Sequence, residues 1–196
     1  MGALLAVLKP LGWFNAFVLK IGRAIGVVAM AAMVVAILIQ VVFRYGFNNA
    51  LPWPDEAARF CMLWMTGLVA PTAFRRGGFV AIDMVPLALP RTIGALLNLF
   101  LLIVCLTVLT VAVQIGYKEV TGFGGKFATA SLYLPLNLGF SEWFRIPRSW
   151  MMASLLVGVA LLISVNIELI LRNLIKLLGG SKELPAIPDA EMAGAE

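Results

Sequence analysis

Long uncharged stretches dominate the pattern of hydrophobic and polar positions along this chain. The first runs from Ala24 to Phe43, between Arg23 and Arg44. As a helix it would be about 30 Å long, which matches the hydrocarbon core of a bilayer. Three further apolar stretches follow, each bounded by charged or aromatic residues. The pattern predicts four membrane-spanning helices, at about 24–43, 55–74, 92–117 and 149–171.

Composition supports this interpretation. Apolar residues make up 62% of the chain and charged residues 13%, against about 45–50% and 25% in soluble domains. Because hydrocarbon offers no water to the backbone, each span must satisfy its polar groups as a helix. We therefore expect an all-α integral membrane protein, with one four-helix domain over 1–178 and a flexible cytoplasmic tail over 179–196.

The N-terminal segment is also apolar. Residues 3–19 are interrupted by Lys9-Pro10 and Gly12, so we expect a separate interfacial helix that lies along the membrane surface. A signal peptide is the competing interpretation. It is disfavoured because the following apolar stretch is too long and ends without a small-residue cleavage site.

Basic residues give a formal net charge of +5, but they flank apolar runs and form no soluble basic face, which disfavours nucleic-acid binding. Their distribution instead predicts topology. With a cytoplasmic N-terminus, nine Lys and Arg residues fall inside and five outside, so both termini are expected in the cytoplasm. The inner set is Lys9, Lys20, Arg23, Arg75, Arg76, Arg91, Arg172, Lys176 and Lys182, and the outer set is Arg44, Lys118, Lys126, Arg145 and Arg148. Arg59, near the start of the second span, belongs to neither set.

Several kinds of chemistry are disfavoured. The chain has no histidine, which argues against haem ligation by histidine, common zinc sites and histidine acid–base catalysis. Cys61 and Cys105 fall inside spans and are expected to be packing residues. We expect no catalytic residue, metal or cofactor. Glu168 and Arg172 are four residues apart and are expected to form a solvated pair at the inner end of the last span.

The densest group of specific residues begins the second span. Pro52 and Pro54 are suited to a helix start, and Asp55 and Glu56 suit the partial positive charge of a helix N-terminus. The spacing allows Glu56 to pair with Arg59.

An aromatic face continues from Glu56 at helical spacing. Trp64 lies about 13 Å beyond Asp55, which is too deep for an ordinary interfacial anchor. Gly67 would permit close helix approach. Bundle packing or lipid contact remains an open alternative to an interface with another membrane protein. The expected subunit interface comprises Trp53, Glu56, Arg59, Phe60, Trp64 and Gly67.

Residues 78–90 are bracketed by Gly77-Gly78 and Pro90. They are expected to form a short amphipathic element at the cytoplasmic surface, with Asp83 facing water or a loop amide. A plain inner loop is the alternative.

These motifs together resemble one family: the DctQ-type small membrane subunit of TRAP (tripartite ATP-independent periplasmic) transporters. The resemblance covers about residues 20–172. It depends on motifs in family order: Trp53-Pro-Asp-Glu56-Ala-Ala-Arg59, Trp64, Gly67, Arg75-Arg-Gly-Gly78, and Val80-Ala-Ile82-Asp83 before Leu89-Pro90.

The chain departs from the family pattern at two places. Phe79 stands where members often have histidine, which puts a polar role of that position in doubt. The loop 118–148 is longer than usual ahead of Ile146-Pro147-Arg-Ser-Trp150, and it could be an insertion facing the periplasm.

The resemblance implies a function. In such systems a soluble periplasmic protein captures an organic acid, and a large multi-span membrane subunit moves it by a sodium-driven elevator mechanism. The small subunit would pack against the scaffold of the large subunit in the bacterial inner membrane, in contact with membrane lipids, and help dock the binding protein. Sodium coupling would reside in the large subunit. Two alternatives remain: an autonomous oligomeric four-helix channel or exporter, and an anchor subunit of a membrane complex.

Overall fold

A computed structural model describes residues 2–77, 90–135 and 143–178. Four long helices account for most of it: α1 (Gly2–Gly46), α2 (Trp53–Arg75), α4 (Arg91–Thr121) and α5 (Ser149–Leu177). All four are long and apolar enough to cross a membrane. The expected all-α membrane fold with four spanning helices is therefore confirmed, and each helix extends beyond the span predicted for it.

Prolines mark the starts of three helices. Pro52, Pro90 and Pro147 come just before α2, α4 and α5. Proline suits these positions because its φ angle fits the first turn and its missing N–H would have no helical partner there. α2 begins at Trp53, two residues before the start at about Asp55 that the sequence predicted.

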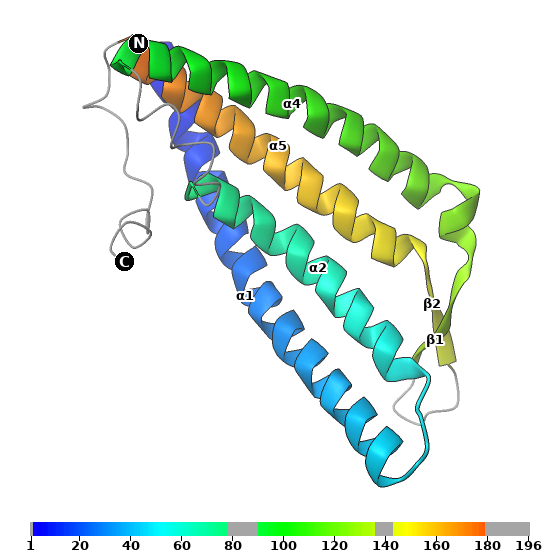
Figure 1. Cartoon of the computed structure of the whole chain (residues 1–196). Coiled ribbons are helices and arrows are strands. Elements are labelled where there is room, and N and C mark those ends of the chain that lie inside the picture. The colour runs from blue at the N-terminus through cyan, green and yellow to red at the C-terminus, as the bar shows by residue number, and fades with distance from the viewer. Residues whose placement is uncertain (1, 78–89, 136–142, 179–196) are drawn as a thin grey trace.

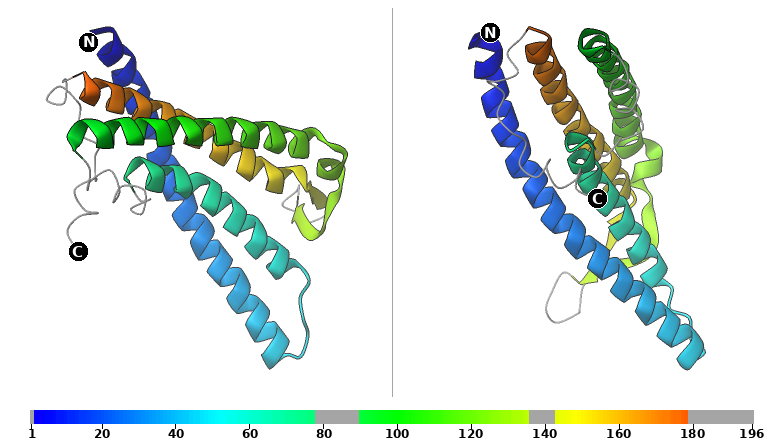
Figure 2. Two further views of the ribbon diagram at one scale, coloured as in Figure 1. Left: turned by 45° about the horizontal axis from the view of Figure 1, so that its top comes forward. Right: turned by 60° about the vertical axis from the view of Figure 1, so that its left-hand side comes forward.

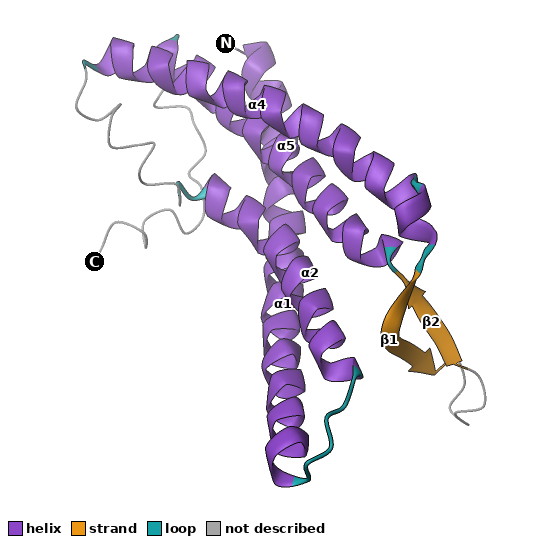
Figure 3. Ribbon diagram, turned by 45° about the vertical axis from the view of Figure 1, so that its right-hand side comes forward, coloured by secondary structure: helices purple, strands orange, loops and turns teal. Residues whose placement is uncertain are grey.

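The helices form two pairs (Figure 1). α1 packs along α2, α4 packs along α5, and the two pairs meet mainly where α2 lies against α5. The pairs diverge toward one end of the molecule, as Figures 2 and 3 show from other sides. α5 contacts each of the other three helices and is the centre of the bundle.

A short irregular unit joins α4 to α5 at the divergent end. It consists of a single 3-10 turn, η1 (Phe123–Lys126), and two antiparallel strands, β1 (Ala128–Pro135) and β2 (Trp143–Pro147). Tyr133 lies opposite Arg145, and the register shifts between Ala128 and Tyr133. This hairpin occupies the long loop 118–148, for which the sequence predicted no regular structure.

α1 corrects one prediction. The sequence predicted a break at Lys9-Pro10 and Gly12, but the helix continues through Pro10. Leu8, Asn15 and Leu19 are buried on either side of the proline, and this packing offsets the backbone hydrogen bond that proline removes. At 1.5 Å per residue the helix is about 68 Å long, which exceeds a bilayer of about 40–45 Å. An interfacial position for residues 3–19 therefore stays a prediction.

Large apolar side chains on α1 and α4 are exposed, including Val28, Leu38, Phe100 and Val108. In a membrane protein, such faces suit lipid tails or another protein. The predicted amphipathic element at 78–90, with Asp83, lies outside the described residues apart from Pro90, and the predicted tail 179–196 lies outside them altogether.

Candidate functional site

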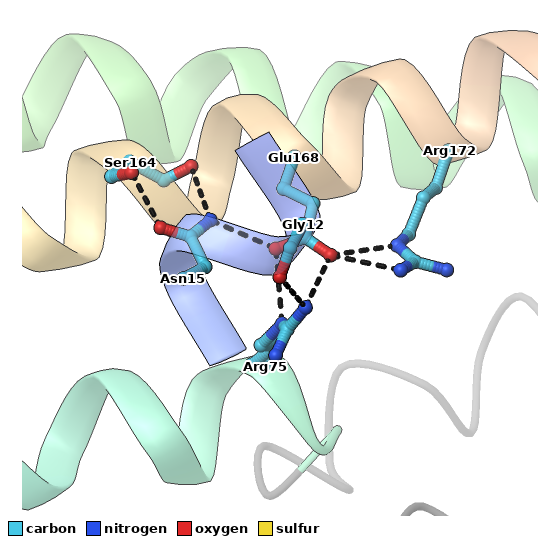
Figure 4. A network of polar contacts seen from close by, with 6 residues as sticks. All are labelled: Gly12, Asn15, Arg75, Ser164, Glu168 and Arg172. Carbon is cyan, nitrogen blue, oxygen red and sulfur yellow. Dashed lines mark hydrogen bonds and ion pairs between the residues drawn. The ribbon is translucent and has the colours of Figure 1, made fainter. Parts of the chain in front are cut away.

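A buried ionic cluster joins three helices near the ends of α2 and α5 (Figure 4). Its centre is Glu168 of α5, whose exposed fraction is 0%. Arg75 of α2 binds this carboxylate with two nitrogens: Nε lies 3.0 Å from Oε2, and Nη2 lies 2.8 Å from Oε1. Arg172, one turn further along α5, donates from Nε and Nη2 to Oε1 at 3.0 and 2.9 Å.

The N-terminal part of α1 completes the cluster. Asn15 donates from Nδ2 to Glu168 Oε2 at 2.8 Å. Arg75 also donates from Nη2 to the carbonyl oxygen of Gly12 at 2.9 Å. On the far side, Ser164 of α5 donates from Oγ to Asn15 Oδ1 at 2.6 Å. The cluster thus joins α1, α2 and α5 through side chains and the backbone carbonyl oxygens of Gly12 and Ser164.

The energetic cost of burying the Glu168 carboxylate restricts how the three helices can be placed. A buried carboxylate loses its hydration, and only well-placed charged partners and hydrogen bonds compensate. Glu168 has two guanidinium groups and an amide, so both of its oxygens are satisfied. Losing one partner would leave the Glu168 carboxylate buried with less compensation for its lost hydration. The cluster therefore favours a single relative placement of the three helices.

The sequence predicted only part of the cluster. Glu168 and Arg172 do pair along α5, but the prediction that their pair is solvated is wrong because both side chains are buried. Arg75 was interpreted as a topology signal and as part of the Arg75-Arg-Gly-Gly78 motif, and Asn15 was not singled out. The available clue was a set of polar residues inside apolar stretches, since such residues in membrane helices usually face protein.

A glycine contact lies further along α2 and α5. A Cβ atom built on Gly67 would come 2.5 Å from the carbonyl oxygen of Ser154, and one built on Gly158 would come 2.8 Å from Gly67 Cα. No larger side chain fits without moving a helix backbone. The close approach predicted at Gly67 is therefore present, and it is made to α5 of the same chain.

Glu56 marks the other end of the same face of α2. Its carboxylate accepts the backbone N–H groups of Ala130 at 2.9 Å and Ser131 at 2.6 Å, both in β1. The Ser131 hydroxyl donates to the same carboxylate at 2.6 Å. On the hairpin, Arg145 donates to the Ala130 carbonyl oxygen at 2.7 Å. Glu56 thus fixes the hairpin to the start of α2.

This geometry corrects the predicted pairing of Glu56 with Arg59. Within the described part of the chain the two side chains form no ion pair, because the hairpin amides occupy the Glu56 carboxylate. Arg59 is exposed. The hairpin partner could not be anticipated, since about 75 residues separate Glu56 from Ser131 in the chain.

The remaining predicted interface residues lie near these contacts. Phe60 and Trp64 are half-buried, with ring centroids 6.3 Å apart. Trp64 Nε1 is buried and has no hydrogen-bond acceptor among the described residues. Trp53 is 40% exposed. One face of α2 thus packs within the chain at three residues. Glu56 contacts the hairpin, and Gly67 and Arg75 contact α5.

The described residues offer little reactive chemistry. They contain no group of three or more Cys, Asp and Glu side chains that could hold a metal ion. Cys61 and Cys105 are free and half-buried. What the arrangement can do is hold helices and a hairpin in fixed positions.

Comparison with known proteins agrees with this interpretation. Residues 33–176 match the family model of the DctQ component of tripartite ATP-independent periplasmic transporters. A putative TRAP transporter small permease protein from Haemophilus influenzae is 30% identical over 80 residues, which cover 39% of this chain and 50% of the relative. The alignment thus spans half the length of that relative. The family match covers most of the chain and includes Glu56, Arg75, Glu168 and Arg172, so the chain belongs to the DctQ family and is a transporter component, not an enzyme.

Proposed function

We propose that this chain is a static scaffold subunit of a sodium-coupled TRAP transporter for an organic acid. It packs against the large membrane subunit and helps dock the periplasmic substrate-binding protein. The observation that supports this proposal most directly is the Glu168 cluster, which joins α1, α2 and α5 through buried charges. A component held this way suits a fixed platform better than a moving carrier, because moving one helix would strand buried charges.

The exposed surface supports the same function. α4 presents large apolar side chains along its length, among them Leu96, Phe100, Val108 and Val111. Trp53 and Arg59 are exposed at the start of α2. These two are the members of the predicted interface best placed for a second protein. Glu56 and Gly67 instead act through the hairpin and α5, which shape that surface from behind.

Charge and helix number support one orientation of the chain in the membrane. The nine-to-five distribution of basic residues favours cytoplasmic termini. The start of α1 and the end of α5 lie at the same end of the bundle (Figure 1). With this orientation the hairpin faces the periplasm, where a soluble binding protein would approach. Cysteines at Gly124 and Ala193 test it: an impermeant reagent applied to intact cells should label the first and not the second.

Copurification in mild detergent is the direct test of function. Tagged full-length chain should retain a much larger multi-span membrane protein. A homo-oligomer of this chain alone would instead favour an autonomous channel or exporter, and association with a redox complex would favour an anchor subunit. Uptake of organic acids into vesicles that contain the complete system, with and without a sodium gradient, tests the substrate class and the coupling ion.

A further inference from the structure

Exposed aromatic residues gather where α4 passes through η1 into the hairpin and the hairpin enters α5. Phe123 is 79% exposed and Phe127 is 55% exposed, and their rings meet edge to face with centroids 5.4 Å apart. Phe144 and Trp150 form a second exposed pair, with centroids 6.3 Å apart. A backbone hydrogen bond of 2.8 Å from Arg148 N to Phe127 O joins the two strands at the base of the hairpin.

Cations accompany these rings. Lys118, Lys126, Arg145 and Arg148 are all exposed. Glu119 is the exposed carboxylate on the same described segment, so the described part of this unit carries excess positive charge. Arg145 lies over the Tyr133 ring at 5.3 Å and donates to the Ala130 carbonyl oxygen, so its side chain is held along the hairpin.

The position of the unit limits what can cover it. It begins where one membrane-spanning helix ends, at Thr121, and finishes where the next begins, at Ser149. It therefore lies near a boundary between hydrocarbon and water. Three of the four exposed rings are phenylalanines, which have no polar group to hydrogen-bond to water, so together with Trp150 they would form an unfavourable apolar patch in bulk water.

We propose that this unit, together with the adjoining helix ends at 117–121 and 149–150, lies in the lipid headgroup layer over the described residues. The aromatic rings enter the boundary with the acyl chains, and the four cations contact lipid phosphodiester groups. Charge complementarity commits the surface to lipid: phosphate is anionic, and exposed cations are next to exposed rings in the chain, as Lys126 is to Phe127 and Arg145 is to Phe144. The unit is then an anchor at the membrane surface, and the hydrogen bonds of Glu56 to β1 connect this anchor to the start of α2.

Spin labels measure the depth directly. In full-length protein with Cys61→Ser and Cys105→Ser, single labels are placed at Phe123 and Phe127 by F123C and F127C. A reference label at Val108, exposed midway along α4, marks the hydrocarbon, and the same spin label attached to free cysteine in buffer marks the water. Collision rates with oxygen, which partitions into lipid, and with a water-soluble nickel chelate are compared in phosphatidylcholine vesicles.

We expect the ratio of oxygen to nickel collisions at 123 and 127 to exceed the ratio of the free label in buffer several-fold and to stay below the ratio at Val108. A ratio equal to that of the free label overturns the proposal, and so do low collision rates with both reagents, which would indicate a protein cover. If F123C or F127C folds poorly, labels at the neighbouring exposed positions Gly124 and Lys126 replace them. A Cβ atom on Gly124 has no heavy atom within 4 Å.

The charge component is tested with lipid composition. Replacing part of the phosphatidylcholine by anionic phosphatidylglycerol should raise the oxygen-to-nickel ratio at Phe123. K126E together with R148E should abolish that increase. R44E, at an exposed position in α1 outside this unit, serves as the control and should leave the increase intact. An increase that survives K126E with R148E, or no increase in the unaltered protein, contradicts the assignment of these cations to phosphates.

Discussion

Two glutamates stabilise opposite ends of the bundle in different ways. Glu168 is fully buried and is held by charged side chains from α2 and α5. Glu56 is half-buried and is held mainly by backbone amides of the hairpin. At the first site water cannot replace a lost partner, whereas at the second it can. The same residue type therefore fixes helix placement at one end and positions a surface loop at the other.

The largest effect is expected from breaking the Glu168 cluster. Arg75→Ala should destabilise the folded protein by about 3–5 kcal/mol, because the Glu168 carboxylate stays buried without the arginine that binds both of its oxygens. Thermal unfolding in detergent measures the loss of stability. It is monitored as the amount of protein that still elutes as a monodisperse species after heating. Lys176→Ala, an exposed cation on the same α5, is the matched control and should behave as the unaltered protein.

Replacing the whole cluster sharpens that test. Arg75→Met, Glu168→Leu and Arg172→Met together should be less harmful than Arg75→Ala alone, since no charge then remains buried. A triple variant as unstable as the single one would mean that the cluster acts through shape and not through charge.

The next largest effect is expected from a substitution at the contact of Gly67 with α5, which lies between the two glutamates. Gly67→Ala places a Cβ atom 2.5 Å from the Ser154 carbonyl oxygen, so the helices must separate, at a cost of about 1–3 kcal/mol. Gly116→Ala is the control, because its Cβ would lie 3.6 Å from the nearest atoms, in Leu156 of α5. Equal melting temperatures for the two variants would contradict a close helix contact at Gly67.

A smaller effect is expected at the hairpin. Glu56→Gln keeps the size of the side chain but weakens its bonds to Ala130 and Ser131, and we expect a loss of about 1–2 kcal/mol. Proteolysis between β1 and β2 should become faster in this variant, since the hairpin is held less firmly. Asp55→Asn, the exposed neighbouring carboxylate, should leave the cleavage rate unchanged.

The smallest effect on stability is expected at Arg59. Because Arg59 is exposed and does not pair with Glu56, Arg59→Ala should change the free energy of unfolding by no more than about 0.5 kcal/mol. If Arg59 belongs to the subunit interface, the same variant should still retain less of the large subunit in copurification than Arg44→Ala does. Equal retention by the two variants would remove Arg59 from the proposed interface.

Helices were predictable because their signals are local. Apolar length, the prolines before α2, α4 and α5, and the acidic first turn of α2 are each visible within a few residues. The apparent break at Pro10 misled because the packing of Leu8, Asn15 and Leu19 is not local. The hairpin also escaped prediction, since its pairing depends on a register shift and on amides held by a distant carboxylate.

The sequence alone determined that this is a four-helix membrane protein of the DctQ family. Its signals, which are apolar stretches as long as the hydrocarbon is thick and the residue types at helix starts, each lie within a short segment of the chain. Only the tertiary structure decided which partners its charges take. Glu168 could be paired with Arg172 from spacing, but Arg75 lies 93 residues away and Asn15 lies 153 residues away. Glu56 could reach Arg59 and yet binds the hairpin. A buried charge takes the partners that the assembled helices and loops bring to it, and sequence spacing shows only those on its own helix.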